Sequence, residues 1–122
     1  MNARERGSAS LWVVAAIALV LLVAGIAIAR TQAVLARHRA ETAADLSALA
    51  GAVGIGTVSD PCALAGRIAS SNGARVLTCS ARLSPDGRSG TVAVAVSYLS
   101  HIPLLGERRV TASARAGRDP PA

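Results

Sequence analysis

The sequence has two cysteines and two histidines, the residue types that form disulfides and the commonest structural zinc sites: Cys62, Cys79, His38 and His101. Two thiolates and two imidazoles around one ion form a common zinc site. The two histidines, however, are far apart in the sequence, which makes zinc a weak interpretation. The two cysteines by themselves predict a disulfide, and two buried reduced thiols are the alternative.

No other pattern of residues predicts catalysis. Serines are numerous, but none lies in the G-x-S-x-G sequence that presents a nucleophilic serine. Gly51, Gly54 and Gly56 resemble a phosphate-binding loop only loosely, because they follow a helical pattern, and a flexible joint is the better interpretation. Asp86 offers a single carboxylate, which is too few for a calcium loop. We therefore predict no catalytic residue, no cofactor and no metal, and keep a membrane-anchored enzyme as a third hypothesis.

The composition limits the size of the fold and the kinds of partner that it can bind. The chain has 122 residues, enough for one small domain, with 52% apolar residues but only 2% aromatics. The net charge is +6, and every basic residue is an arginine. Few of these arginines stand beside an aromatic ring that could stack on a base, so the sequence predicts no nucleic-acid partner.

An uncharged apolar run is the first element that must position these residues. Residues 8–29 carry no charge and are long enough to span a bilayer as a helix. Trp12 lies near one end, where an indole favours the membrane interface. Residues 1–7 would then be a cytoplasmic N-terminus. The rival interpretation is a secretory signal peptide cleaved after Ala29, but the run is longer than such a peptide needs.

The helical pattern continues beyond the membrane segment. Residues 30–51 contain helix formers and no proline, so they predict an extracytoplasmic continuation of the helix, ended by Gly51 and followed by a glycine-rich joint over 52–60. Small residues recur every three or four positions and form one stripe, which would let another helix approach closely. The residues expected to pack against a partner helix are Gly25, Ala29, Ala33, Ala36, Ala40 and Ala43.

The second half of the chain predicts a small head over residues 61–116. Asp60 and Pro61 begin a short helix, as a cap and a first helical residue. Alternating segments over 75–83, 91–99 and 108–115 predict three antiparallel strands with one buried face. Leu77, Cys79, Ala81 and Leu83 are expected on the buried face of the first strand, and residues 117–122 are expected to be a disordered tail. The fold class is therefore α+β: a long N-terminal helix, then a short helix packed on a three-stranded antiparallel sheet.

The placement of the two cysteines predicts a bond between helix and sheet. Cys62 lies on the short helix and Cys79 on the buried face of the first strand. A loop of this size contributes about 3 kcal/mol in the chain-entropy model. Because disulfides persist outside the cytoplasm, the head is expected on the outer side of the membrane.

The order of these parts resembles the TadE-like proteins of tight-adherence (Flp-type) pilus systems, of the type encoded near helicase and secretion genes. The resemblance rests on the start at residues 4–12, the apolar run, and residues 32–50 with Arg37-His38-Arg39 followed by Ala-Ala-Asp-Leu. It implies a pilin-like fold, and it identifies Gly7 as the residue after which a prepilin peptidase would cut. Pilin-like TadE segments carry Glu five residues later, where this chain has Trp12, so the resemblance implies a minor or accessory pilin more than a major subunit.

The resemblance and the pattern together give one expected function. The chain is expected to be a single-pass membrane protein of a pilus or secretion assembly that acts by helix packing, without chemistry. Its expected partners are other pilin-like subunits or inner-membrane platform proteins, together with membrane lipid. The alternative is a small secreted binding protein released after Ala29. On the first interpretation, replacing Ala36 or Ala40 with Leu should block assembly and leave membrane insertion intact.

Overall fold

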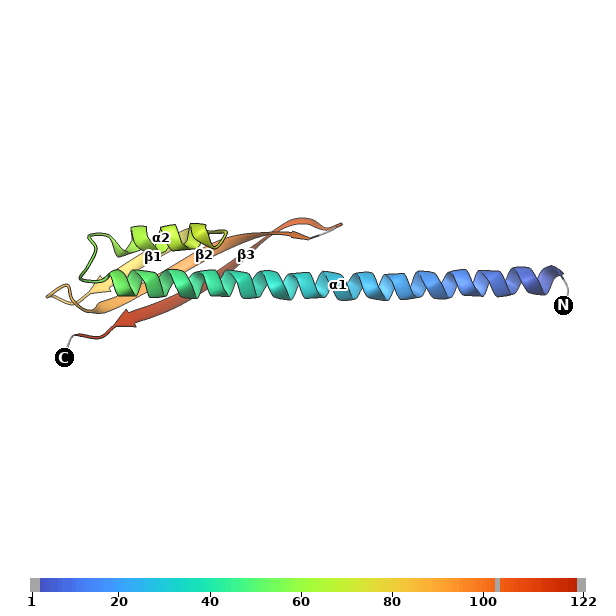
Figure 1. The fold of residues 1–122 in the computed structure, drawn as a ribbon, viewed down its shortest axis with the longest axis horizontal. Coiled ribbons are helices and arrows are strands. Elements are labelled where there is room, and N and C mark those ends of the chain that lie inside the picture. The colour runs from blue at the N-terminus through green and yellow to red at the C-terminus, as the bar shows by residue number, and fades with distance from the viewer. Residues whose placement is uncertain (1–2, 103, 121–122) are drawn as a thin grey trace. The chain divides into compact units, whose positions relative to one another are not determined.

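The computed structural model describes residues 3–102 and 104–120, with side chains from residue 7 onward. The chain divides into two compact units, one ending at Ala33 and the other beginning at Val34. A single helix, α1 (Ala3–Gly54), contributes to both units (Figure 1).

The first unit is the N-terminal part of α1. Its apolar side chains from Leu11 to Ile28 are exposed, and Trp12 is 75% exposed. Leucine, isoleucine, valine and alanine cover the helix on all sides here, which is the pattern of a segment that faces lipid. Near the N-terminus, α1 is long and apolar enough to cross a membrane.

The second unit is an α+β head, as the sequence predicts. It contains the C-terminal part of α1, α2 (Pro61–Ser71), β1 (Ala74–Leu83), β2 (Gly90–Ile102) and β3 (Gly106–Arg118). The strands form an antiparallel sheet in the order β1-β2-β3. Asp60 caps α2 as predicted, because its carboxylate accepts a hydrogen bond from the Ala63 N–H at 3.1 Å.

The core of the head lies between one face of the sheet and both helices. Alternation along β2 buries Val92, Val94 and Val96, as predicted. Small side chains of α1 and α2 pack against these valines, which brings helix backbone and sheet close together. The helical residues of this core are Ala43, Ala44, Ala48, Ala65 and Ala69.

The end of α1 differs from the prediction. The helix continues to Gly54, so the expectation that Gly51 ends it and that residues 52–60 form a joint is wrong over 52–54. Gly51 is buried, and a Cβ atom placed on it would lie 2.9 Å from Cγ1 of Val92. Gly51 therefore serves close packing of helix on sheet. The turn comes later, at Gly56, which has a φ of +79°.

The C-terminal end also differs. β3 continues to Arg118, so residues 117 and 118 of the expected tail belong to the sheet, while residues 121 and 122 lie outside the described residues. The Arg118 guanidinium donates to the carbonyl oxygen of Val53 at 3.0 Å and to that of Ile55. Val53 lies in the last turn of α1 and Ile55 follows its last residue, so Arg118 supplies donors at the end of the helix, where the Thr57 hydroxyl also donates to the Val53 carbonyl at 3.4 Å.

The first strand is less regular than predicted. Its pairing with β2 shifts between Val76 and Thr78, which identifies a β-bulge at Leu77. Leu77 is consequently exposed, and Val76 packs against the core in its place. Ala81 and Leu83 pair with β2 opposite Val92 and Gly90 as alternation requires, but both are exposed.

Candidate packing surface of the long helix

The two cysteines lie where the sequence places them. Cys62, in the first turn of α2, is bonded to Cys79 of β1, with their Cα atoms 5.8 Å apart. Cys79 packs against the buried core, so the bond fastens α2 to the sheet next to the packed valines. The cysteine pair is therefore structural, and no free cysteine occurs in the described ranges.

The predicted packing stripe is divided between two environments. Ala36, Ala40 and Ala43 are at most 3% exposed, and Ala43 belongs to the core in which α1 packs on the sheet of its own head. The expectation that these three alanines contact a partner helix is therefore corrected: they belong to the head, which begins at Val34 instead of residue 61. In the first unit, a Cβ atom on Gly25 would have nothing within 4 Å, and Ala29 and Ala33 are half-buried.

The opposite side of α1 in the head carries a second apolar stripe that the sequence reasoning missed. On a helix of 3.6 residues per turn, positions 35, 46, 49 and 53 share one side, facing away from Ala40, Ala43 and Ala44. This outer stripe consists of Leu35, Leu46, Leu49 and Val53, all exposed. Their spacing of three, four and seven was visible in the sequence, but the neighbouring alanines gave a more regular signal.

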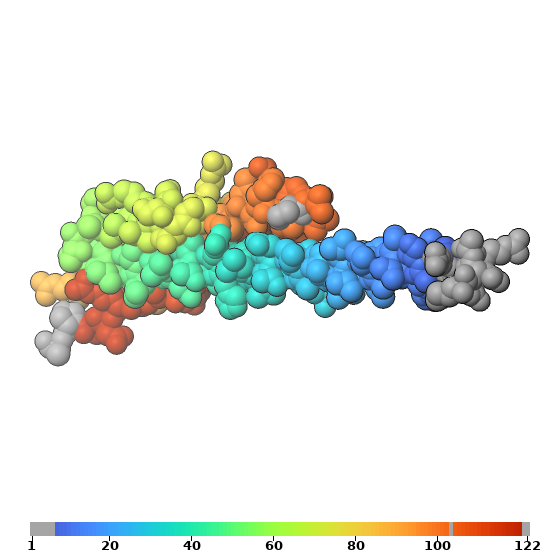
Figure 2. All heavy atoms as spheres, turned by 45° about the vertical axis from the view of Figure 1, so that its right-hand side comes forward, coloured from blue at the N-terminus to red at the C-terminus, as the bar shows by residue number. Residues whose placement is uncertain are grey.

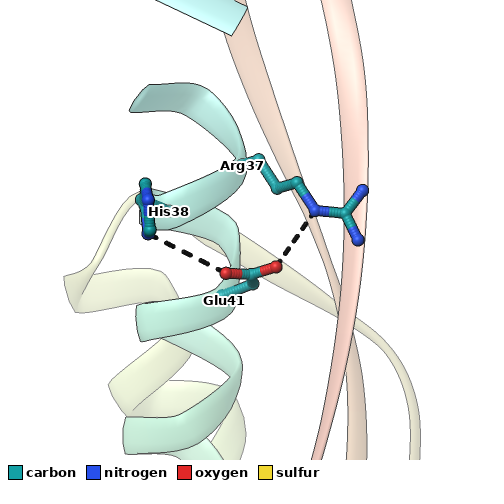
Figure 3. Close-up of polar contacts among 3 residues, drawn as sticks. All are labelled: Arg37, His38 and Glu41. Atoms are coloured by element: carbon teal, nitrogen blue, oxygen red, sulfur yellow. Dashed lines mark hydrogen bonds and ion pairs between the residues drawn. The ribbon is translucent and has the colours of Figure 1, made fainter. Parts of the chain in front are cut away.

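A polar cluster lies on α1 near the beginning of the head (Figure 3). Arg37 Nε donates to Glu41 Oε1 at 3.0 Å, and His38 Nδ1 lies 3.9 Å from Glu41 Oε2. Arg37 and His38 are exposed, so these contacts contribute only a few tenths of a kcal/mol. The geometry is that of a solvated helix surface.

Arg39 makes the polar contact that ties this part of α1 to the sheet. Its guanidinium donates to the Tyr98 hydroxyl of β2 at 3.3 Å. A shallow groove beside this contact is lined by residues of α1, α2 and β2, including Leu35, Thr42 and Asn72. His38 lines the groove, while His101 lies on β2 opposite Glu107, so the structure does not bring the two histidines together.

The predicted processing residues lie within α1. Gly7 and Ala29 are both helical, and Gly7 has open space around its Cα. Within residues 3–102 and 104–120, no three His, Cys, Asp or Glu side chains gather as a metal site.

Comparison with known protein families finds a match on this helix. Residues 7–54 match the family model of Flp pilus-assembly TadE/G-like proteins. This segment is similar to TadE/G-like proteins. The matched range begins at the predicted processing glycine and ends with the last residue of α1.

The TadE/G-like segment thus comprises the apolar run and the part of α1 that packs in the head. The disulfide-linked remainder of the head, α2 and the sheet, lies outside the matched range. No curated protein and no solved structure matches the chain. The TadE-like resemblance expected from residues 4–12 and 32–50 is therefore confirmed on the helix.

Proposed function

We propose that this chain is a membrane-anchored minor-pilin-like or accessory component of a Flp/Tad-type pilus or secretion assembly, and that it acts by helix packing without catalysis. The observation that carries the proposal is the TadE/G-like match, which covers the same residues as the apolar helix. The disulfide suits an orientation with the N-terminus in the cytoplasm and the head outside, because disulfides persist outside the cytoplasm.

The packing surface in this proposal takes account of the burial within the head. In the first unit, the open space at Gly25 suits close approach of another helix in lipid. In the head, the outer stripe offers leucine and valine side chains that are 40–62% exposed. Pilin-like subunits or inner-membrane platform proteins that present apolar helices are the partners these surfaces fit.

A paired substitution in the outer stripe tests the packing mechanism. Changing Leu46 and Leu49 together to Gln removes two apolar side chains that would each contribute about 1.5–3 kcal/mol on full burial. Pilus or secretion output per membrane-inserted molecule should fall at least about tenfold, since about 1.4 kcal/mol corresponds to tenfold in affinity. Output should be measured in cells that carry the complete assembly system.

Two control variants make the result specific. Leu83→Gln alters a comparably exposed leucine on β1 and should leave output unchanged. Ala40→Leu places a large side chain in the buried core and should destabilise the head itself by about 1–3 kcal/mol. Unchanged output from the Leu46 and Leu49 double variant, with normal insertion, would eliminate the outer stripe as the packing surface.

The mature N-terminus separates the proposal from its alternative. Mass spectrometry of the native protein should find Met1 for an unprocessed anchor, or Ser8 for processing after Gly7 despite Trp12. An N-terminus at Arg30 would mean cleavage after Ala29 and release of a secreted binding protein. That outcome would overturn the anchored function.

A further inference from the structure

The end of the β2–β3 hairpin exposes leucines to an unusual degree. Leu104 is 106% exposed and Leu105 is 71% exposed, and Leu99, in the adjoining part of β2, is also exposed. Figure 2 shows this part of the hairpin, in orange, as a projection at the surface. A protein surface usually carries exposed apolar residues singly, so clustered leucines at a turn indicate a contact with something apolar.

The backbone at this turn adds a second indication. Leu104 has a φ of +69°, and it is the one non-glycine residue with positive φ among those described. Glycine or asparagine is favoured in this left-handed region, while a branched apolar side chain is uncommon there. A leucine at this position thus costs free energy twice, because its backbone adopts an unfavourable conformation and its apolar side chain is exposed to water. This combination points to a role for the side chain.

Contacts within the head locate the hairpin end. β2 runs antiparallel to α1, because Val92 lies beside Gly51 and the Tyr98 hydroxyl accepts a hydrogen bond from Arg39. Following β2 from Val92 past Tyr98 therefore leads toward the Val34 end of the head. At that end the chain connects through only a few residues to the uncharged run that closes at Ala29.

Arginines accompany the exposed leucines. Arg108 and Arg109 follow the turn on β3, both exposed, and Arg109 pairs across the sheet with Leu99. Glu107 is the carboxylate of this hairpin end, opposite His101. Apolar side chains beside guanidinium groups are the pattern of segments that lie in a membrane interface, where the leucines enter the acyl boundary and arginines bind phosphate.

We propose that this hairpin end, defined by Leu99, Leu104, Leu105, Arg108 and Arg109, inserts into the headgroup region of the leaflet from which α1 emerges. Its ligand is the phosphate-bearing surface of an anionic phospholipid bilayer. The head then has two attachments to one membrane: the helix and the hairpin end. The inference rests on the membrane anchoring in the proposed function.

Depth-dependent fluorescence quenching in the full-length protein tests the insertion. In a Trp12→Phe background, Leu105→Trp provides one fluorophore, and the protein is placed in bilayer nanodiscs of phosphatidylglycerol brominated near the top of the acyl chains. Leu105→Trp should emit at shorter wavelength and be quenched at least twofold. The matched control, Leu83→Trp in the same background, puts the probe at a comparably exposed leucine next to the β1–β2 turn and should not be quenched.

Further lipids and variants identify the ligand and distinguish this inference from the membrane anchoring on which it rests. Nanodiscs of phosphatidylcholine, or Arg108→Gln with Arg109→Gln, should reduce the quenching at least twofold, and equal quenching in every arm would overturn the anionic-lipid assignment. Trp12 of the wild-type protein reports on anchoring: if it escapes quenching by bromine placed deep in the chains, the anchored function itself fails. Quenching of Trp12 without quenching of the Leu105→Trp variant would overturn insertion alone, and would leave the hairpin end as a surface for protein.

Discussion

Asp86 organises the turn between β1 and β2 through hydrogen bonds to its carboxylate. The Ser84 hydroxyl and the Arg88 N–H both donate to Oδ1, the latter at 3.1 Å. These donors, the serine first, hold the pKa of Asp86 below its ordinary value of 3.8, since they favour the charged form. A residue that looked like a weak calcium ligand in the sequence is therefore a turn residue.

Removing the serine hydroxyl should raise the pKa of Asp86 toward its ordinary value. Because the folded-state pKa is lowered, the carboxylate supports the turn at pH values above the unfolded pKa and loses this effect as the pH falls through the folded pKa. A pH titration followed by NMR, on the Asp86 carboxyl carbon and the Arg88 amide, should show the midpoint rising in Ser84→Ala. Ser113→Ala, on β3, is the control, and an identical midpoint in all three proteins would contradict the assignment.

At the scale of elements, glycines in the two helices have opposite roles. Gly51 of α1 faces Val92 at a distance too short for an added methyl group, whereas a methyl group on Gly66 of α2 would meet nothing within 4 Å. Helix propensity favours alanine at both sites by about 1 kcal/mol. Packing therefore determines how the effect of an alanine substitution on stability differs between the two sites.

We expect Gly66→Ala to raise the free energy of unfolding of the head by about 0.5–1 kcal/mol. Gly51→Ala should lower it by about 1 kcal/mol, since overpacking of about 1–3 kcal/mol exceeds the gain in propensity. Urea unfolding of the full-length protein in mild detergent, with Tyr98 as the probe, measures both changes. Stabilisation of equal size by both substitutions would mean that α1 does not approach the sheet at Gly51.

The elements themselves were largely predictable from local pattern. Alternation along β2 and the Asp60 cap of α2 are short-range signals, and the structure confirms both. The bulge at Leu77 was not predictable, because it is fixed by pairing with β2 instead of by the residues of β1. The prediction that the alanine stripe packs on a partner helix failed for a related reason. Periodicity groups Ala36, Ala40 and Ala43 on one face of the helix, but it does not identify what covers that face.

At the scale of the whole molecule, one covalent bond compensates for a core of small side chains. The residues of that core are mostly alanine and valine, which bury less area than the leucine and aromatic side chains of larger cores. The bond between Cys62 and Cys79 closes a loop with a sequence separation of 17. It joins α2 to the sheet, so its effect falls on the folding of the head.

Reducing this bond should lower the free energy of unfolding of the head by about 3 kcal/mol. Urea titrations of the full-length protein in detergent, with and without reductant, measure the change as a shift in midpoint. The Cys62→Ser and Cys79→Ser double variant should be equally destabilised and insensitive to reductant. A wild-type midpoint that reductant leaves unchanged, with reduction verified by thiol labelling, would refute a stabilising role.

The hydrogen bonds of Arg118 have a consequence for biosynthesis. This arginine lies on β3, the third strand of the sheet, yet it supplies donors to carbonyls at the end of the first helix. Synthesis of β3 must therefore be complete before the end of the helix receives these donors. A nascent chain can place α1 in the bilayer early, but the head closes only after β3 has been synthesised.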